Sequence, residues 1–215
     1  MPTKDERQGA LVAVGDSIIN GFNRPIAQVP ALGFGQLLAQ AMDLSYTRYA
    51  KGGSTSRDIV EQFIPQVRGR YDVGVLSCGT NDAYQRMSMA DLEANLTKAV
   101  GHLSGHCDRV VVLTIPISAE ATDVVRRVAA TLPNVHVVDA HVRGVRQLRA
   151  DLIHPTSVGQ MELADRAARA LGAPLPSKVA GFPVGERIEA GYLLGHWIRL
   201  PVTHLRRIAK RLLGR

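Results

Sequence analysis

The sequence predicts an α/β fold in three layers, α/β/α, in which helices cover both faces of one parallel sheet. Two observations predict it. Five short apolar runs alternate along the chain with stretches whose apolar residues recur three and four apart, as strands alternate with amphipathic helices. Strands that alternate with helices in this way are parallel and joined by right-handed crossovers. The chain of 215 residues is also long enough to bury one core without a second domain.

The first part of the pattern lies before residue 70. The first strand is expected at 9–15, GALVAVG, an apolar run that ends at a glycine. The amphipathic stretch FGQLLAQAMD predicts a helix over 34–43, and LSYTRYA predicts the second strand over 44–50. A second amphipathic stretch, SRDIVEQFIPQVR, predicts a helix over 56–68.

The second part repeats the alternation. Three runs rich in Val, or bounded by Gly, Pro and Asp, predict strands at 72–79, 109–116 and 134–140. Apolar residues at helical spacing predict helices over 88–105 and 119–131 between them. The sheet is therefore expected to have five strands.

The chain is expected to divide after its last domain helix. SVGQMELADRAARAL predicts that helix over 157–171, so we expect one domain over residues 1–172. Prolines and glycines are frequent just beyond it, which is typical of a linker. We expect residues 173–215 to form this linker and a basic amphipathic C-terminal helix.

The net charge of +7 is concentrated at the C-terminal end of the chain. No acidic residue follows Glu189, whereas six basic residues do, so residues 1–189 carry a net charge of only +1. A neutral body with a basic appendage does not favour nucleic-acid binding. The five apolar residues ALVAV that follow the charged leader are too short for the core of a signal peptide, so we expect a cytoplasmic protein.

Polar and glycine-rich loops follow the expected strands. In parallel sheets ligands bind beyond the carboxyl ends of the strands. Each loop alone could be an ordinary turn or helix cap, but together they bring a hydroxyl, a histidine, a carboxylate and several hydrogen-bond donors to one edge of the sheet. The loops are Gly15-Asp16-Ser17, KGGSTS at 51–56, CGTND at 78–82 and DLIHPTS at 151–157.

Acyl transfer at neutral pH needs these groups. Ser17 becomes a nucleophile only when a base takes its proton, and His154 is the histidine on this edge that has a carboxylate close in the chain. Asp151 can accept the Nδ1 hydrogen of His154 and turn Nε2 towards Ser17. The backbone N–H groups of Ser17 and Gly53 and the side-chain amide of Asn81 are available to stabilise the oxyanion.

The four loops resemble the sequence blocks of the SGNH hydrolases, the GDSL-type esterases and lipases. GDS at 15–17, GGSTS at 52–56, GTND at 79–82 and DLIHP at 151–155 occur in the family's order and spacing, and the resemblance covers about residues 10–171. The residue after the serine is Ile18, where the family name has leucine. The resemblance implies a flavodoxin-like sandwich with a five-stranded parallel sheet.

The resemblance also implies the roles of the residues. Ser17 would be the nucleophile, His154 the general base and acid, and Asp151 its orienting carboxylate. Ser17, Gly53 and Asn81 would form the oxyanion hole, with Gly52 as the alternative to Gly53. Asp16 and Asp82 flank two of these residues, and we expect them to hold loop amides rather than to take part in the chemistry.

No metal or other cofactor is expected. His102 and His106 lie four residues apart on an expected helix and Cys107 follows, but the His-Glu-x-x-His pattern of a catalytic metal site is absent. The two cysteines do not make a disulfide framework.

The C-terminal segment, 192–215, is not explained by the resemblance. Beyond Pro201 apolar residues recur at helical spacing, with basic residues between them, and Trp197 precedes them. This pattern is typical of a helix that binds an anionic membrane surface. A helix that packs on the domain with its basic face in water would show the same pattern. The apolar set is Val202, Leu205, Ile208, Ala209, Leu212 and Leu213, and the basic set is Arg206, Arg207, Lys210 and Arg211.

We therefore expect a serine hydrolase that cleaves carboxylic esters through an acyl-enzyme on Ser17. Short acyl esters and lipid or lysophospholipid esters both fit, with a slight preference for lipid esters because of the amphipathic segment. The alternatives are an esterase of O-acetylated carbohydrates and a non-catalytic module that binds an acyl or lipid group and is recruited by the basic segment.

Overall fold

The computed structural model describes residues 8–21, 24–182 and 190–212, without the side chains of 206–208 and 210–212. Its centre is one five-stranded sheet in which every neighbouring pair of strands is parallel, in the order β2-β1-β3-β4-β5. The predicted α/β fold class and strand number are confirmed. The strands are β1 (Ala10–Gly15), β2 (Ser45–Ala50), β3 (Tyr71–Ser77), β4 (Cys107–Leu113) and β5 (Val135–Val138).

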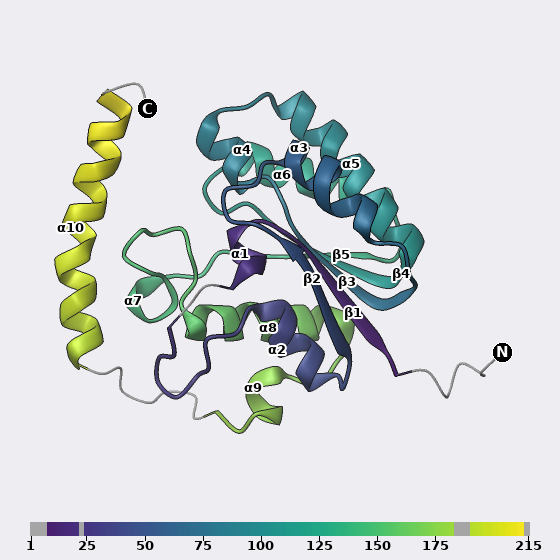
Figure 1. Ribbon diagram of the computed structural model, residues 1–215, viewed down its shortest axis with the longest axis horizontal. Helices are drawn as coiled ribbons and strands as arrows, with labels where there is room; N and C mark the ends of the chain where they lie inside the picture. Colours follow the sequence, from purple (N-terminus) through teal and green to yellow (C-terminus); the bar gives the residue numbers. More distant parts are fainter. Residues whose placement is uncertain (1–7, 22–23, 183–189, 213–215) are drawn as a thin grey trace.

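Helices cover both faces of the sheet (Figure 1). One face is covered by α2 (Phe34–Ala41), α8 (Ser157–Leu171) and the short α9 (Pro176–Val179). The other is covered by α5 (Met89–His106) and α6 (Ala119–Ala129). Side chains alternate between the faces along each strand, so that Leu11 and Ala13 of β1 pack in one apolar cluster and Val12 and Val14 in the other. The sheet is therefore buried on both sides, as parallel sheets usually are.

The helix expected over 56–68 is irregular. It begins as one turn of α-helix, α3 (Ser56–Asp58), widens into a π-helical segment, η1 (Ile59–Phe63), and ends as a 3₁₀ turn, η2 (Ile64–Gln66). Pro65 lies in that last turn and has no N–H to donate, so a regular α-helical ladder cannot pass through it. The other expected domain helices end within a few residues of their predicted bounds.

The switch point of the sheet lies at β1. The chain leaves β1 towards β2 on one side and returns to β3 on the other, which opens a crevice at the carboxyl end of β1. β1 and β3 approach each other closely there, because a Cβ on Gly15 would lie 2.2 Å from the carbonyl oxygen of Ser77. The chain can leave β1 at this point only because residue 15 has no side chain.

The domain packing extends beyond residue 172, where the sequence analysis begins the linker. Asp165 of α8 accepts hydrogen bonds from the backbone N–H (3.0 Å) and the hydroxyl (2.6 Å) of Ser177. Leu175 and Phe182 pack against the apolar cluster that contains α2 and α8. Residues 173–182 are thus part of the domain surface.

The C-terminal helix α10 (Ala190–Leu212) begins before the point that the sequence analysis gives it, and Pro201 lies inside it. The carbonyl of Trp197, which would accept from an N–H at position 201, belongs to an exposed residue and can be hydrated. Figure 1 shows α10 beside α7 (Gly144–Gln147), on the side of the sheet where the strands end. Its side chains at Arg206, Arg207, Ile208, Lys210, Arg211 and Leu212, and residues 213–215, lie outside the described part of the chain.

Replacing Gly15 tests the close approach of β1 and β3. Gly15→Ala places a methyl group against the Ser77 carbonyl, so we expect the free energy of unfolding to fall by about 2 kcal/mol or more, measured by urea denaturation. Gly101→Ala is the matched control, because a Cβ there meets nothing within 4 Å in the α5 helix. We expect it to raise stability by about 0.5 kcal/mol. Equal stabilities of the two variants would contradict the packing argument.

Candidate active site

Ser17 is the first residue of the short helix α1 (Ser17–Asn20), which starts directly after β1. The side chain of Asp16 caps this helix by accepting the N–H of Ile18 at 3.0 Å, and the helix ends at Gly21 with a φ of 64°. Ile18 and Ile19 are buried and anchor the helix on the sheet. The serine is therefore held at the carboxyl edge of the sheet, at the switch point.

His154 joins Ser17 to Asp151. Its Nε2 lies 2.8 Å from Ser17 Oγ and its Nδ1 lies 3.0 Å from Asp151 Oδ2. The serine hydroxyl and the histidine are 137 residues apart in the sequence. With Nδ1–H donating to the carboxylate, Nε2 is the acceptor that faces the serine hydroxyl. This is the arrangement in which a histidine can take a proton from a serine.

The loop that carries His154 is fixed by its own aspartate. Asp151 Oδ1 accepts the backbone N–H groups of Ile153 (2.9 Å) and His154 (2.8 Å). Leu152, between them, has a φ of 58°, a conformation that costs energy for a residue other than glycine. A backbone hydrogen bond of 2.9 Å from Arg149 N–H to the His154 carbonyl closes the loop.

The charge of Asp151 is stabilised. Partial burial acts to raise its pKa, but the hydrogen bonds from the ring and backbone of His154, the coulombic effect of His154 and the N–H of Ile153 outweigh it. The pKa of Asp151 is therefore held well below its ordinary value. Asp151 is a carboxylate at all pH values at which the protein would work, and it can orient and stabilise a protonated His154.

Two loops carry Gly53 and Asn81, the other two expected oxyanion donors. Gly53 has a φ of 85° in the turn that Ser54 N–H closes on Lys51 O at 3.4 Å, and a Cβ on Gly53 would meet nothing within 4 Å. A Cβ on Gly52 would lie 3.8 Å from Ser17 Cβ, which places this turn against the serine. Asn81 Nδ2 donates to Ser54 O at 2.8 Å. An amide has two N–H groups, so a second donor of Asn81 is left for a ligand.

Asp82 ties these two loops together. It is fully buried, and it accepts the backbone N–H (2.8 Å) and the hydroxyl (2.5 Å) of Ser56. Asn95 of α5 donates to the same hydroxyl at 2.9 Å. This arrangement fixes the turn around Gly53 relative to Asn81.

Asp16 is buried and incompletely paired. Its Oδ1 accepts Ile18 N–H and the Ser77 hydroxyl (2.9 Å), whereas its Oδ2 has no hydrogen-bond partner among the described residues. Burial raises the pKa of Asp16 to about 6, against the lowering effects of these hydrogen bonds and of His154. Asp16 thus contacts the backbone of α1 at an energetic cost.

Gln160 also holds α1, and the sequence analysis does not identify it. It is buried in α8, where its Oε1 accepts the N–H of Phe34 at 2.8 Å and its Nε2 donates to the carbonyl of Ile18 at 3.1 Å. It thereby satisfies one unpaired group at the start of α2 and one in α1. The sequence offers one signal for Gln160, a polar residue among the apolar residues of 157–171. The groups that it contacts, however, depend on the tertiary fold.

A small, mainly apolar pocket is lined by the sequence neighbours of Ser17 and Asn81. It has a volume of about 90 Å³ and includes the neighbours of two residues already described, Ile18 beside Ser17 and Thr80 beside Asn81. Leu152 and Ile153, next to His154, line it from the other side. The other lining residues are Pro116, Ile117, Ala140, His141, Val142 and Leu148.

The histidines of α5 serve local structure. The rings of His102 and His106 stack with centroids 4.1 Å apart, and each hydrogen-bonds to a backbone carbonyl, that of Val67 and that of His102 respectively. Within the described ranges no group of three His, Cys, Asp or Glu residues could hold a metal ion.

Comparison with known proteins gives one family-model match. A model of the GDSL-like lipase/acylhydrolase family matches residues 13–161. The comparison with curated proteins finds no match.

Several solved structures share the fold. One is LAE5, an α/β hydrolase enzyme from the metagenome of Lake Arreo, Spain (TM-score 0.62, 20% identity, covering 76% of this chain and 95% of that one). Axe2, an acetylxylan esterase from Geobacillus stearothermophilus, has a TM-score of 0.58 and 22% identity, with coverages of 76% and 95%. The lipase Lip_vut3 from goat rumen metagenome has a TM-score of 0.59 and 19% identity, with coverages of 76% and 97%.

The raised pKa of Asp16 predicts a pH-dependent stability. Since the folded state favours the protonated form, the contribution of Asp16 to stability is fully present below its unfolded pKa near 3.8 and is lost as pH rises through about 6. A shift of about two pKa units corresponds to a change of about 3 kcal/mol in the free energy of unfolding. Asp16→Asn cannot ionise, so the stability of the wild type relative to this variant should fall by about that amount between pH 4 and pH 7.5.

Urea denaturation of both proteins at several pH values measures this difference. The pH dependence contributed by other groups, including Asp151, is common to both proteins and cancels. A stability difference that is the same at pH 4 and pH 7.5 would show that burial does not perturb Asp16.

Proposed function

Since the chain belongs to the GDSL-like lipase/acylhydrolase family, we propose that it hydrolyses carboxylic esters through an acyl-enzyme on Ser17, with His154 and Asp151 completing the catalytic triad. Family membership makes it an ester-hydrolysing enzyme. The observation that carries the rest of the proposal is the pair of contacts of His154, 2.8 Å to Ser17 Oγ and 3.0 Å to Asp151 Oδ2.

The contacts support the following sequence of steps. His154 Nε2 takes the hydroxyl proton as Ser17 Oγ attacks the ester carbonyl, and Asp151 stabilises the imidazolium that forms. The oxyanion of the tetrahedral intermediate accepts hydrogen bonds from the N–H groups of Ser17 and Gly53 and from the amide of Asn81. His154 then protonates the leaving alcohol. A water molecule, deprotonated by His154, releases the acid from Ser17.

We propose that the small apolar pocket lined by Ile18 and Thr80 holds the acyl group. Its volume of about 90 Å³ favours short acyl chains, so an extended lipid chain would have to leave it towards solvent. A second candidate substrate class is O-acetylated carbohydrates. The size of the pocket and the fold shared with Axe2, an acetylxylan esterase, favour it.

We also propose that α10 attaches the enzyme peripherally to an anionic membrane. Leu194, Trp197, Ile198 and Leu205 fall on one face of the helix and are between 58% and 65% exposed. The sequence of the same segment is basic, and each basic residue near an anionic surface contributes about 1 kcal/mol. Among the described helices, none has both the length and the apolarity to cross a bilayer.

Ser17 and Asn81 variants test the mechanism. Ser17→Ala should abolish hydrolysis of short p-nitrophenyl esters and labelling by a fluorophosphonate probe, because both require the hydroxyl. Asn81→Ala should lower kcat about 100- to 1,000-fold if its amide binds the oxyanion. Ser157→Ala is the matched control, because the buried Ser157 hydroxyl has no hydrogen-bond partner in the described structure. Hydrolysis that persists in Ser17→Ala would refute the proposal.

Vesicle sedimentation tests membrane attachment. We expect the full chain to sediment with vesicles that contain 30% anionic lipid at low salt, and to dissociate as salt is added. Leu194→Ser combined with Trp197→Ser removes two exposed apolar side chains and should weaken binding at least about tenfold. The control is Tyr84→Ser combined with Val179→Ser, two exposed residues outside α10. Wild-type protein that stays in the supernatant, or equal binding of both double variants, would exclude α10 as the attachment site.

A further inference from the structure

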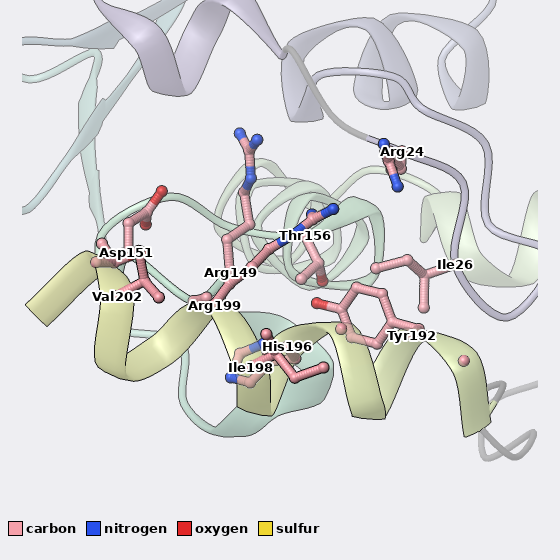
Figure 2. Close-up of a pocket in the computed structure, with 14 residues that line it drawn as sticks. Arg24, Ile26, Arg149, Asp151, Thr156, Tyr192, His196, Ile198, Arg199 and Val202 are labelled. Atoms are coloured by element: carbon pink, nitrogen blue, oxygen red, sulfur yellow. The ribbon is translucent and has the colours of Figure 1, made fainter.

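A cavity of about 470 Å³ lies between α10 and the loop that carries the catalytic residues (Figure 2). Asp151 and Thr156, which flank His154 in the sequence, line one side of it. Residues of α10, including Tyr192 and Arg199, line the other. It is about five times larger than the apolar pocket lined by Ile18 and Thr80, and the two have no lining residue in common.

The lining of this cavity is basic. Arg24 comes from the segment after α1, Arg149 from the loop before Asp151, and Arg199 from α10, and Figure 2 shows these three side chains around the same space. Among the described residues of the lining, the only carboxylate is that of Asp151, which accepts three hydrogen bonds in its own loop and from His154. Guanidinium groups bind phosphate oxygens in a bidentate manner.

Two polar side chains of α10 complete the lining. His196 is only 5% exposed, lies in the cavity wall, and its ring contacts those of Tyr192 and Trp197. Tyr192 donates to the carbonyl of Val145 at 3.3 Å, which fixes α10 against the domain. Burial raises the pKa of the Tyr192 hydroxyl, and the positive charges of Arg149 and Arg199 act to lower it. Both arginines are therefore close enough to this hydroxyl to affect its charge.

The position of the cavity relates it to the leaving group. The small pocket is lined by Ile18 and Thr80, the sequence neighbours of Ser17 and Asn81. The basic cavity is lined by Asp151 and Thr156, on either side of His154 in the sequence, and His154 is the residue that would protonate the departing alcohol oxygen. Acyl and alcohol halves of one ester would therefore face an apolar and a basic compartment respectively.

We propose that this cavity binds a phosphate group carried by the alcohol half of the ester substrate, with Arg199 and Arg24 as its principal ligands. The inference rests on the proposed ester hydrolysis. A phosphate monoester carries a charge of about −2 at neutral pH and presents the oxygens that guanidinium groups bind. The phosphate can belong to a soluble ester or to a lipid head group, because both present the same oxygens.

Paired substrates test this proposal. 1-Butyrylglycerol 3-phosphate and 1-butyrylglycerol share the acyl group and the glycerol and differ in the phosphate alone. We expect kcat/KM of the full-length enzyme to be at least about tenfold higher for the phosphate ester, and Arg199→Gln to reduce this ratio about tenfold. Arg199→Lys should restore part of it, because the charge is kept. Lysophosphatidate in vesicles, measured against its monoacylglycerol, shows whether a lipid head group is preferred to the soluble ester.

A matched control and a direct binding measurement separate this proposal from the proposed function. Arg169→Gln removes an exposed arginine from the far end of α8 and should leave the ratio unchanged. Glycerol 3-phosphate should bind Ser17→Ala protein in calorimetry, and Arg199→Gln or Arg24→Gln in that background should weaken binding about tenfold. Absence of this binding, or an unchanged substrate ratio in Arg199→Gln, overturns the phosphate site even if esters are hydrolysed. Phosphate binding without any ester hydrolysis overturns the proposed function instead.

Discussion

The contact between Ser17 Oγ and His154 Nε2 joins residues 137 positions apart, and the surrounding structure is arranged to maintain it. The position of Ser17 is fixed by the packing of Gly15 on Ser77 and by the hydrogen bond from Gln160 to the Ile18 carbonyl. His154 is fixed by the three hydrogen bonds that Asp151 accepts. Each of these contacts comes from a different part of the chain. The geometry of the site is therefore a property of the whole fold, not of one loop.

This geometry has an energetic cost that the core has to offset. Asp16 is buried with an unpaired carboxylate oxygen, and Leu152 adopts a positive φ inside the loop of Asp151 and His154. Conformations and groups of this kind persist only where the surrounding structure overdetermines them, and they concentrate at functional sites. Here two apolar clusters, one on each face of the sheet, supply the stability. The apolar clusters therefore stabilise the fold, whereas the groups that set the geometry of the site reduce its stability.

The strands, most of the domain helices and the family could be predicted because each depends on local signals. An apolar run that ends at Gly15 and a loop that contains Asp151 and His154 can be recognised without knowing what packs on them. Gln160 could not be recognised, since its two partners belong to α1 and α2 and are far away in the sequence. The course of α10 through Pro201 was also missed, because the cost of a proline inside a helix depends on whether the unpaired carbonyl is exposed.

The helix α10 is the element whose role the family relation leaves open, since the family model ends at residue 161. Its two faces carry different side chains. Arg199 and His196 line the cavity beside the loop of Asp151 and His154, whereas Leu194, Trp197 and Leu205 are exposed to solvent. If both proposals hold, the same helix would place the enzyme on an anionic surface and select a phosphate-bearing alcohol beside that surface. The reaction would then be supplied by the shared fold, and the choice of substrate by an element outside the family model.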